Sequence, residues 1–471
     1  MSADIRVAIV GGGIAGLAAA HRLGELGLEG PYLLLERAPR LGGKIATERT
    51  GEYVIEGGPD CFLASKPAGV ALCHALGIED RLRGTDPRFR RSYVKRNGRL
   101  HELPAGVTGL VPSRIRPLLT TRLLTLRGRM RAGLEIFVRS RADGTDESIA
   151  GFVTRRFGVE AYRWLVEPLL SGIFAGDGEQ LSLRATFPQL IELERTQGSV
   201  IRMMLKARVG RARPAGSGEA QLGFVTPVTG LDEIVDAIER TIPERAIRRG
   251  VVVERLWRDG GAYVMRLDDG VELRAESVIL ATPSFITADL VAGFDDGLAA
   301  ALREIPFVST ATVSVAFPAA AIARPLDGYG YVSPRAEGGP VVACTWTSNK
   351  FPDRAPQDGV LIRFFVGRAG AEEVVSASDE EIKRLIRAEL ERVLGISAEP
   401  VLWRIFRWPK GMPQYTLGHH DRLARIEDAT GRHEGLFLAG ASYRGIGIPD
   451  CIDSGRAAAE LTVGYVCRVA A

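Results

Sequence analysis

The sequence predicts an α/β protein in which one parallel-sheet domain is assembled from segments far apart in the chain. Near the N-terminus a short apolar run, Ile5 to Val10, is followed by a glycine-rich turn and a helix-like stretch, Ile14 to Leu26. Near the C-terminus Gly435 to Gly440 is a second apolar run that ends in glycine, and a helix-like stretch, Cys451 to Val463, follows it. Such runs are typical of buried parallel strands. The long intervening sequence predicts inserted domains.

Length and composition narrow the class of protein. A chain of 471 residues is expected to form two or three lobes. The net charge of +4 gives no reason to expect a nucleic-acid partner, and 46% hydrophobic and 25% charged residues are ordinary globular values. The chain enters its first strand at once and has no run of about 18 apolar residues, so we expect a cytoplasmic protein whose membrane contact is at most peripheral.

The cysteines are scattered without C-x-x-C spacing. This distribution argues against a zinc site and a disulfide framework and fits a reducing cytosol, so no metal is expected. The cysteines are Cys61, Cys73, Cys344, Cys451 and Cys467.

The N-terminal turn has the G-x-G-x-x-G spacing of a Rossmann-like nucleotide-binding unit. Gly11 permits the tight turn, Gly13 lets a pyrophosphate approach the backbone, and Gly16 lets helix and strand pack closely. The helix N-terminus supplies amide donors to the phosphates. A second strand, Tyr32 to Leu35, ends in Glu36, where an acid accepts a hydrogen bond from an adenosine ribose. The motif alone does not distinguish NAD from FAD.

Further glycine-rich turns follow in order along the chain. Arg37 to Lys44 contains a Gly-Gly pair that permits close approach of a cofactor, and Arg40 can neutralise a phosphate. Tyr53 to Pro59 is typical of a strand that ends in another such turn. Near the C-terminus, Gly445 to Asp450 leads into a helix whose dipole can face electron-rich ring atoms. A second strand–helix junction favours FAD over NAD.

The central part of the chain has a different character. Pro104 to Arg141 carries eight arginines against one acid, Glu135, with apolar residues interleaved at mostly helical spacing. This basic amphipathic pattern suits an anionic membrane surface. The alternative is a helix with an apolar core face and solvated arginines. Strands and helices resume afterwards over 224–241, 251–253, 262–267, 271–273, 278–283, 312–317, 341–346, 360–366 and 379–394.

Several motifs together resemble a known family. VGGGIAGLAAA with Glu36, then RLGGK, LATP and LFLAG, are similar to the flavin-containing amine oxidase and protoporphyrinogen oxidase superfamily. Longer stretches resemble the protoporphyrinogen/coproporphyrinogen oxidase family, FAD enzymes that aromatise a porphyrinogen in haem synthesis. These stretches are EGGPDCFLASK (56–66), SGIFAGDGEQLS (171–182), FPQLIELE (187–194), VTPVTGLDEIVDAI (225–238), RWPKGMPQYTLGH (407–419) and AGASYRGIGIPDCIDSGRAAA (439–459).

The resemblance implies a division of the chain and an FAD site. It implies an FAD-binding domain of residues 1–75, 218–288 and 430–471, a mixed α+β substrate-binding domain of residues 76–90 and 289–429, and a helical membrane-associating domain of residues 91–217. Trp408 has an alternative as a core aromatic, and Asp60 stands where some relatives carry arginine. The implied FAD residues are Gly11, Gly12, Gly13, Ile14, Ala15, Gly16, Glu36, Arg37, Lys44, Gly58, Pro59, Asp60, Cys61, Val253, Trp408, Ile446, Gly447 and Ile448.

For the substrate, the resemblance implies a flat macrocycle held between apolar walls. Tyr329 and Val332 form one wall and Phe365 the other, with sheet-core aromatics as the alternative. Tyr329 replaces a phenylalanine, so its hydroxyl needs a partner. Lys66 and Arg91 are the candidate cations for propionates, although either could be a surface charge. At Arg91 the register is open by one residue, because Ser92 gives the strict alignment.

The expected chemistry is hydride transfer from a meso carbon to the flavin, with reoxidation by oxygen and release of hydrogen peroxide. Three rounds remove six electrons. The resemblance suggests that the Gly172 backbone faces the substrate. A flavin-dependent amine oxidase is the alternative, although Cys451 lies in a porphyrinogen-type motif rather than a flavin-linking one; a flavin-bound, non-catalytic membrane-surface protein is a minor alternative. Coproporphyrinogen III and protoporphyrinogen IX both stay open, with the cations favouring the former. A homodimer is a further candidate partner.

Overall fold

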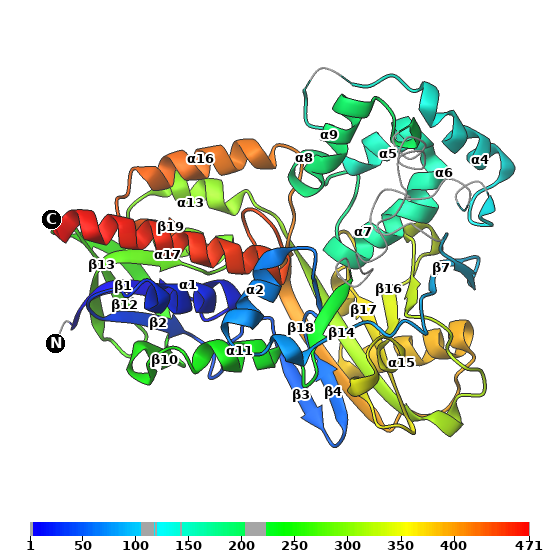
Figure 1. Ribbon diagram of the computed structural model, residues 1–471, viewed down its shortest axis with the longest axis horizontal. Coiled ribbons are helices and arrows are strands. Elements are labelled where there is room, and N and C mark those ends of the chain that lie inside the picture. The colour runs from blue at the N-terminus through cyan, green and yellow to red at the C-terminus, as the bar shows by residue number, and fades with distance from the viewer. Residues whose placement is uncertain (1–2, 105–116, 118–119, 142–143, 203–222, 471) are drawn as a thin grey trace.

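The structure, a computed structural model, describes residues 3–104, 117, 120–141, 144–202 and 223–470. Three groups of elements are visible in Figure 1: a mainly parallel sheet with its helices, a second sheet beside it, and a set of helices above the second sheet. No helix of the described ranges is long and apolar enough to cross a bilayer.

The first sheet joins segments from both ends of the chain. Strand β1 pairs in parallel with β2 on one side and β13 on the other, and the end of β13 pairs in parallel with β19. The start of β13 forms an antiparallel meander with β12 and β11. The strands are β1 (Ala3–Val10), β2 (Tyr32–Glu36), β10 (Ile247–Arg249), β11 (Val253–Asp259), β12 (Ala262–Leu267), β13 (Glu272–Leu280) and β19 (Leu436–Leu438).

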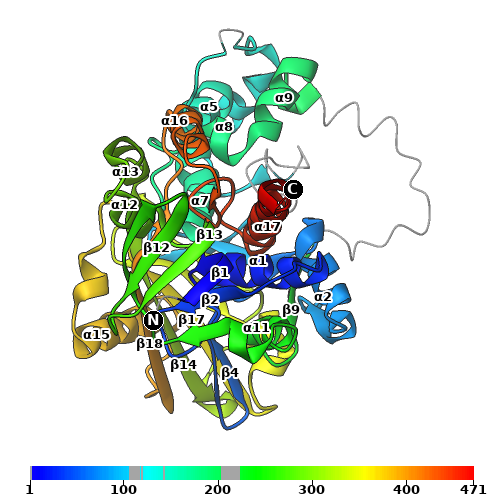
Figure 2. The same cartoon turned by 90° about the vertical axis from the view of Figure 1, so that its left-hand side faces the viewer.

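Helices cover both faces of this sheet, which explains its continuous apolar strands. Along β1, Val7 and Ile9 enter one core while Ala8 and Val10 enter the other. Figure 2 shows helices on both sides of the sheet. The first core is covered by α1 (Ile14–Glu25), α2 (Pro67–Ala75), α11 (Asp232–Glu239) and α17 (Ile448–Ala470), and the second by α12 (Ser284–Val291), α13 (Asp296–Arg303) and α16 (His419–Gly431).

The second sheet runs in the order β18-β14-β17-β16-β15-β7-β8. One face of this sheet packs on α15 (Asp379–Glu389). Side chains on the other face contact Ile55, toward the first sheet's domain. Smaller sheets pair β3 (Thr47–Thr50) with β4 (Tyr53–Glu56), and β9 (Phe224–Pro227) with β5 (Phe62–Leu63) and β6 (Leu82–Gly84). The strands of the large sheet are β7 (Ser92–Arg96), β8 (Arg99–Glu102), β14 (Phe307–Pro318), β15 (Gly330–Val332), β16 (Val341–Trp346), β17 (Gly359–Val366) and β18 (Leu402–Pro413).

Strands β7 and β8 correct one predicted boundary. They fall inside the range 91–217 that was assigned to a helical domain, yet β7 pairs in parallel with β15 of the second sheet. The sheet therefore extends to Glu102. The physical reason is a long-range pairing between Ser92–Val94 and Gly330–Val332, for which the local sequence gives no signal.

The helical part has a core of its own. The acid of the arginine-rich segment, Glu135, is fully buried, forms an ion pair with buried Arg156, and accepts hydrogen bonds from Ser199 and two backbone N–H groups. Part of that segment therefore serves packing. The helices are α4 (Leu126–Gly133), α5 (Ile149–Phe157), α6 (Val159–Ala161), α7 (Glu167–Phe174), α8 (Leu183–Thr186) and α9 (Pro188–Gln197), with α14 (Thr347–Lys350) in the second sheet's domain.

Candidate functional site

The first glycine turn has the geometry that its spacing predicts. Gly11 has a φ of +108°, and its N–H donates to Leu35 O at 2.8 Å. A Cβ at Gly16 would lie 1.9 Å from Gly11 O, so only glycine fits there, whereas a Cβ at Gly13 would meet no atom within 4 Å. Helix α1 begins at Ile14 without a side-chain cap or an acid in its first turn. Its free N–H donors and the open space at Gly13 fit a pyrophosphate.

Glu36 is fixed at the end of β2, beside this turn. Its carboxylate accepts the Gly12 N–H at 2.6 Å and the Ala38 N–H at 2.7 Å. The Glu36 carbonyl accepts the Val251 N–H at 3.0 Å, which brings the start of β11, with Val253, to the same edge of the sheet. Arg37 is exposed next to it. The residues predicted for the adenosine end therefore gather where the parallel strands end.

The Gly42-Gly43 turn packs directly on the first glycine turn. The Gly42 N–H donates to Gly12 O at 2.8 Å, and a Cβ at Gly43 would lie 3.1 Å from the Gly13 Cα. Arg40 was expected to neutralise a phosphate, but its guanidinium donates to the carbonyls of Leu41, Gly43 and Ile45 at 2.6–3.1 Å. Arg40 thus holds the turn in shape.

Lys44, Gly58 and Trp408 meet at the next turn. A Cβ at Gly58 would lie 1.8 Å from Lys44 O and 3.7 Å from the Trp408 ring. Trp408 Nε1 donates to Gly57 O at 2.8 Å. Burial lowers the pKa of Lys44, and Cys451 at the start of α17 lies close enough to oppose this shift in part. The structure therefore places these predicted cofactor residues together.

The C-terminal junction lies beside the N-terminal one. A Cβ at Gly440 would lie 3.8 Å from the Ala15 Cβ, and α17 packs on α1 so closely that a Cβ at Gly455 would lie 2.0 Å from Ala15 O. The turn of Ile446, Gly447 and Ile448 leads into α17, and the Gly447 N–H donates to Asp450 Oδ2 at 3.1 Å. The two junctions together form one continuous cradle.

A buried group of charges lies behind the Gly58 turn and was not predicted. Asp60 accepts hydrogen bonds from Lys350 Nζ at 2.8 Å and from Cys61 Sγ at 3.0 Å. Burial opposes ionisation of Asp60, but Lys350 and Arg363 hold its pKa well below its usual range. Burial and Asp60 raise the pKa of Cys61, so its thiol stays protonated. Lys350 and Arg363 belong to distant strands and helices, and no local motif marks them.

The predicted substrate walls line one row across the second sheet. Val332 on β15 pairs with Ala343 on β16, Ala343 pairs with Phe365 on β17, and Phe365 pairs with Thr312 on β14. Paired residues share a face, so Val332 and Phe365 lie side by side on one wall, and the prediction that they form opposite walls is wrong. Thr312 Oγ1 donates to Gly57 O at 2.8 Å, which connects this row to the cofactor turn.

Gly172 lies at the Val332 end of that row, whereas Tyr329 precedes β15 and lies outside the row. A Cβ at Gly172, on α7, would lie 3.6 Å from Val332 Cγ1, so Gly172 faces the wall. The Tyr329 hydroxyl donates to Asp86 O at 2.8 Å, which supplies the partner that the substitution of phenylalanine requires.

Both predicted propionate cations have acidic partners. Lys66 Nζ lies 2.6 and 2.7 Å from the two Asp450 carboxylate oxygens, and Arg91 lies 2.6 Å from Asp327. Each cation is about half exposed, at 47% and 54%. Ser92, the alternative register, begins β7. A propionate would have to share these cations with their present partners.

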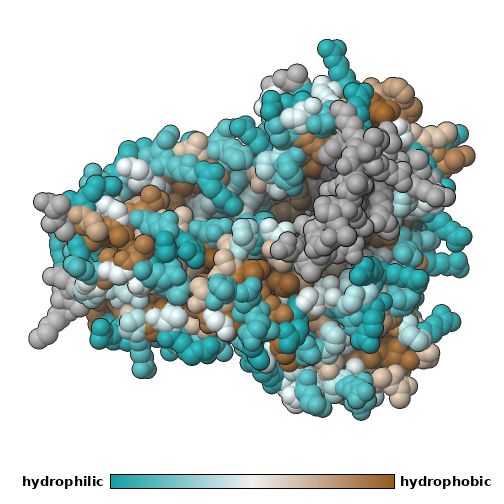
Figure 3. Space-filling model, in the orientation of Figure 1, coloured by the Kyte–Doolittle hydropathy of each residue, from teal (hydrophilic) through white to brown (hydrophobic). Residues whose placement is uncertain are grey.

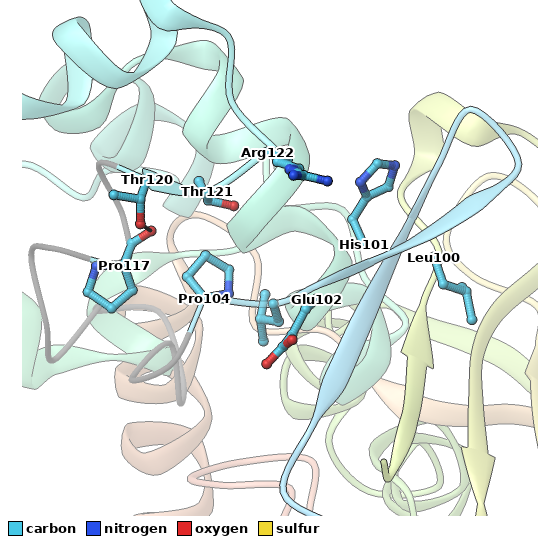
Figure 4. A pocket seen from close by; sticks show the side chains of 9 residues that line it. Leu100, His101, Glu102, Pro104, Pro117, Thr120, Thr121 and Arg122 are labelled. Carbon is cyan, nitrogen blue, oxygen red and sulfur yellow. Dashed lines mark hydrogen bonds between the residues drawn. The ribbon is translucent and has the colours of Figure 1, made fainter. Parts of the chain in front are cut away.

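A separate cavity of about 440 Å³ lies between β8 and the helical part (Figure 4). Its walls contain none of the predicted site residues. Within the described residues no cluster of His, Cys, Asp and Glu could hold a metal ion. The cavity is lined by Leu100, His101, Glu102, Leu103, Pro104, Pro117, Thr120, Thr121 and Arg122.

A flavoprotein oxidoreductase is the class that this fold and cradle define. The family model described as flavin-containing amine oxidoreductase matches residues 14–462, so the chain belongs to that family. The predicted α/β fold, the family resemblance and FAD as cofactor are thereby confirmed. The open space at Gly13 and the uncapped α1 fit that cofactor.

Particular relatives are similar over nearly the whole chain. Coproporphyrinogen III oxidase of Bacillus subtilis (strain 168) is 37% identical over 470 residues, with 98% of each chain covered. The chloroplastic protoporphyrinogen oxidase of Oryza sativa subsp. japonica is 30% identical, covering 98% of this chain and 89% of the relative. A crystal structure from Exiguobacterium sp. 255-15, provisionally named as a protoporphyrinogen oxidase, has a TM-score of 0.86 and 31% identity, covering 98% of this chain and 99% of that one.

Proposed function

We propose that this chain is an FAD-dependent oxidase that removes six electrons from a porphyrinogen, with oxygen as acceptor and hydrogen peroxide as product. Coproporphyrinogen III is the proposed substrate and protoporphyrinogen IX the second candidate. The observation that carries the proposal is the 37% identity to the Bacillus subtilis coproporphyrinogen III oxidase across 98% of both chains. The reaction belongs to haem biosynthesis.

The arrangement of the site supports a flat, electron-rich substrate. Val332 and Phe365 present apolar side chains in one row, and Gly172 faces that row with backbone alone. Aromatisation drives the oxidation, so orientation of the macrocycle matters more than a strong base. Bound FAD supplies the hydride acceptor, and the protein orients the ring and excludes water.

The test compares kcat/KM for coproporphyrinogen III, protoporphyrinogen IX and a polyamine, with peroxide release as the readout. We expect the highest value for coproporphyrinogen III and none above background for the polyamine. Oxidation of the polyamine alone would instead favour an amine oxidase. The cysteine considered for that alternative, Cys451, is buried in the first turn of α17, and its N–H donates to Gly447 O at 3.0 Å.

Lys66 is proposed to bind a propionate by exchanging it for Asp450. Coproporphyrinogen carries two propionates where protoporphyrinogen carries vinyls, so Lys66→Met should raise KM severalfold for the former and less for the latter. Because the Lys66–Asp450 pair is half exposed, stability should change by less than about 1 kcal/mol. Equal KM changes for both substrates would contradict the assignment.

We also propose a peripheral contact with an anionic membrane through α4 and the turn that follows it. Leu126, Met130, Leu134 and Phe137 recur at helical spacing and are 53–81% exposed, and brown and teal residues alternate over this region in Figure 3. Exposed arginines such as Arg127 flank them. Arg114 and Arg116 of the predicted segment lie outside the described residues.

Co-sedimentation with vesicles tests this contact. Vesicles with anionic lipid should retain the protein, and Met130→Ser with Phe137→Ser should release most of it, since two of the four exposed apolar anchors are lost. Vesicles of neutral lipid are the control, because cations near an anionic surface contribute roughly 1 kcal/mol each. No retention on anionic vesicles would contradict the proposal. The homodimer stays a prediction.

A further inference from the structure

The charge group behind the Gly58 turn has more positive than negative charge. Its cations are Lys350, Arg354 and Arg363, and its acids are Glu56 and Asp60, so the excess is one positive charge. Burial raises the pKa of Glu56 to about 7, which increases the excess near neutral pH. Buried charges are normally paired, because desolvating an unpaired ion is costly. The group therefore lacks an electron-rich partner.

Arg363 is the member with unused hydrogen-bond donors. Its side chain is 2% exposed, and Nη2 donates to Gly58 O. Its Nε and Nη1 atoms are buried without a hydrogen-bond partner in the described protein. In contrast, the Arg354 donors reach Val228 O, Thr226 Oγ1 and Pro227 O at 2.7–3.1 Å. Since buried N–H groups are almost always satisfied, Arg363 points to an acceptor that the described residues do not supply.

The position of Arg363 indicates which acceptor this is. Arg363 lies on β17 two residues before Phe365, whose ring centre is 4.7 Å from the guanidinium carbon. Its third donor holds the Gly58 carbonyl, and Gly58 and its neighbours are predicted cofactor residues. Arg363 therefore stands between the cofactor turn and the substrate wall, on the cofactor side.

We propose that Arg363 is a flavin-contacting residue: its free N–H groups donate to the flavin ring of FAD, and its charge stabilises the ring after hydride uptake. A hydride brings two electrons and one proton, so the neutral oxidised ring becomes negatively charged. A buried cation beside it lowers the free energy of that state. The inference deepens the proposed function, on which its catalytic meaning rests, but its FAD contact is independent of the porphyrinogen.

The experiment measures the FAD dissociation constant, by titrating the apoprotein with FAD, and the midpoint potential of the flavin in the FAD-loaded protein. In Arg363→Gln we expect FAD affinity to fall about tenfold to a hundredfold, as for lost hydrogen bonds to a charged group, and the potential to become more negative. The remaining two cations and two acids balance, so the variant should fold. Arg363→Lys keeps the charge but loses the fork, so it should weaken FAD binding with a potential near that of the unmodified protein.

Arg404→Gln is the matched control. Arg363 on β17 and Arg404 on β18 flank the same residue of β14, Ser314, but Arg404 is paired with Glu48. Neither FAD affinity nor potential should change in Arg404→Gln.

Two results would overturn the assignment. One is an unchanged affinity and potential in Arg363→Gln. The other is a raised KM for porphyrinogen with an unchanged potential, which would make Arg363 a substrate residue. If the Arg363→Gln protein binds no FAD, its midpoint potential cannot be measured. In that case, a potential in Arg363→Lys below that of the unmodified protein would overturn the proposed role of the charge. The proposed substrate alone would be contradicted if the unmodified, FAD-loaded protein did not oxidise porphyrinogen while the Arg363 variants showed the expected shifts in FAD affinity and midpoint potential.

Discussion

At the scale of single residues, the glycines of the first turn have different reasons to be glycine. The Gly16 position is filled by the Gly11 carbonyl, whereas the Gly13 position opens onto empty space. We predict that Gly16→Ala lowers the free energy of unfolding of the apoprotein by about 1–3 kcal/mol, because the methyl group overpacks the strand–helix contact. Gly13→Ala should change that free energy by less than about 1 kcal/mol.

FAD binding separates the same two variants in the opposite sense. Gly13→Ala places a methyl group where the pyrophosphate approaches, so it should weaken FAD binding although the apoprotein is stable. Urea unfolding of the apoproteins and FAD titration measure the two effects. An unchanged FAD affinity in Gly13→Ala would contradict the prediction that the pyrophosphate binds at this turn.

His419 should make stability depend on pH. It is 1% exposed, its Nε2–H donates to Tyr443 O at 2.8 Å, and its ring stacks on Tyr415. Burial lowers the pKa of His419 to about 4 from 6.5. The unfolded chain therefore binds a proton first as pH falls, so this stability is present above pH 6.5 and is lost toward pH 4. Urea unfolding should show a loss of about 2 kcal/mol between pH 7 and pH 5 from this residue.

A matched variant isolates this contribution. His419→Gln keeps a donor for the Tyr443 carbonyl but does not titrate, so its stability should fall less between pH 7 and pH 5. Equal losses in both proteins would show that other groups cause the pH dependence.

The sequence could predict residues that lie in continuous motifs, such as Gly11 to Gly16 and Ile446 to Ile448. Each turn has a contact within the motif, between Gly11 and Gly16 and between Gly447 and Asp450, so spacing indicates much of the geometry. It could not predict Lys350 or Arg363, because each is a single cation that gains its meaning from a turn about 300 residues earlier in the chain. The sequence also led to the prediction that Arg40 neutralises a phosphate, because spacing does not reveal the nearby backbone carbonyls to which Arg40 donates.

At the scale of elements, α7 and β15 together shape the proposed substrate wall. Gly172 is exposed on α7, and its missing side chain leaves space in front of Val332. We predict that Gly172→Val folds, because a Cβ at Gly172 meets only Val332 Cγ1, at an ordinary contact distance of 3.6 Å, but lowers kcat/KM for porphyrinogen at least about tenfold by occupying that space.

Ile173 provides the control for this helix, since it is exposed at the adjacent position. Ile173→Val should leave kcat/KM close to that of the unmodified protein. If Gly172→Val retains full turnover, the proposal that the macrocycle lies close to α7 is wrong.

Element boundaries were harder to predict than element types. The strands around the cofactor were predicted from apolar runs that are buried on both faces. The β7–β8 hairpin has a local signal in its Asn97-Gly98 turn, which the prediction did not use, whereas its place in the second sheet depends on pairing with β15. Likewise, the charge of the arginine-rich segment did not reveal that Arg131 binds the carbonyls of Arg155 and Arg156 at the end of α5.

At the scale of the whole molecule, the two ends of the chain build one cofactor site. Helices α1 and α17 pack through Gly455 and Ala15, which aligns the N-terminal glycine turn with the turn before α17. The second sheet then closes this cradle with Trp408, Thr312 and Arg363. Cofactor and substrate wall are thus joined through the Gly57–Gly58 turn, and this junction is where we place the chemistry.

The central claim is that a porphyrinogen reduces FAD bound in this cradle. The direct measurement is anaerobic mixing of the FAD-loaded protein with coproporphyrinogen III while the flavin absorbance is followed. We predict rapid loss of the oxidised flavin band with porphyrin formation, and return of the band with hydrogen peroxide when oxygen is admitted. An oxidised band that persists with coproporphyrinogen III and with protoporphyrinogen IX would contradict the claim.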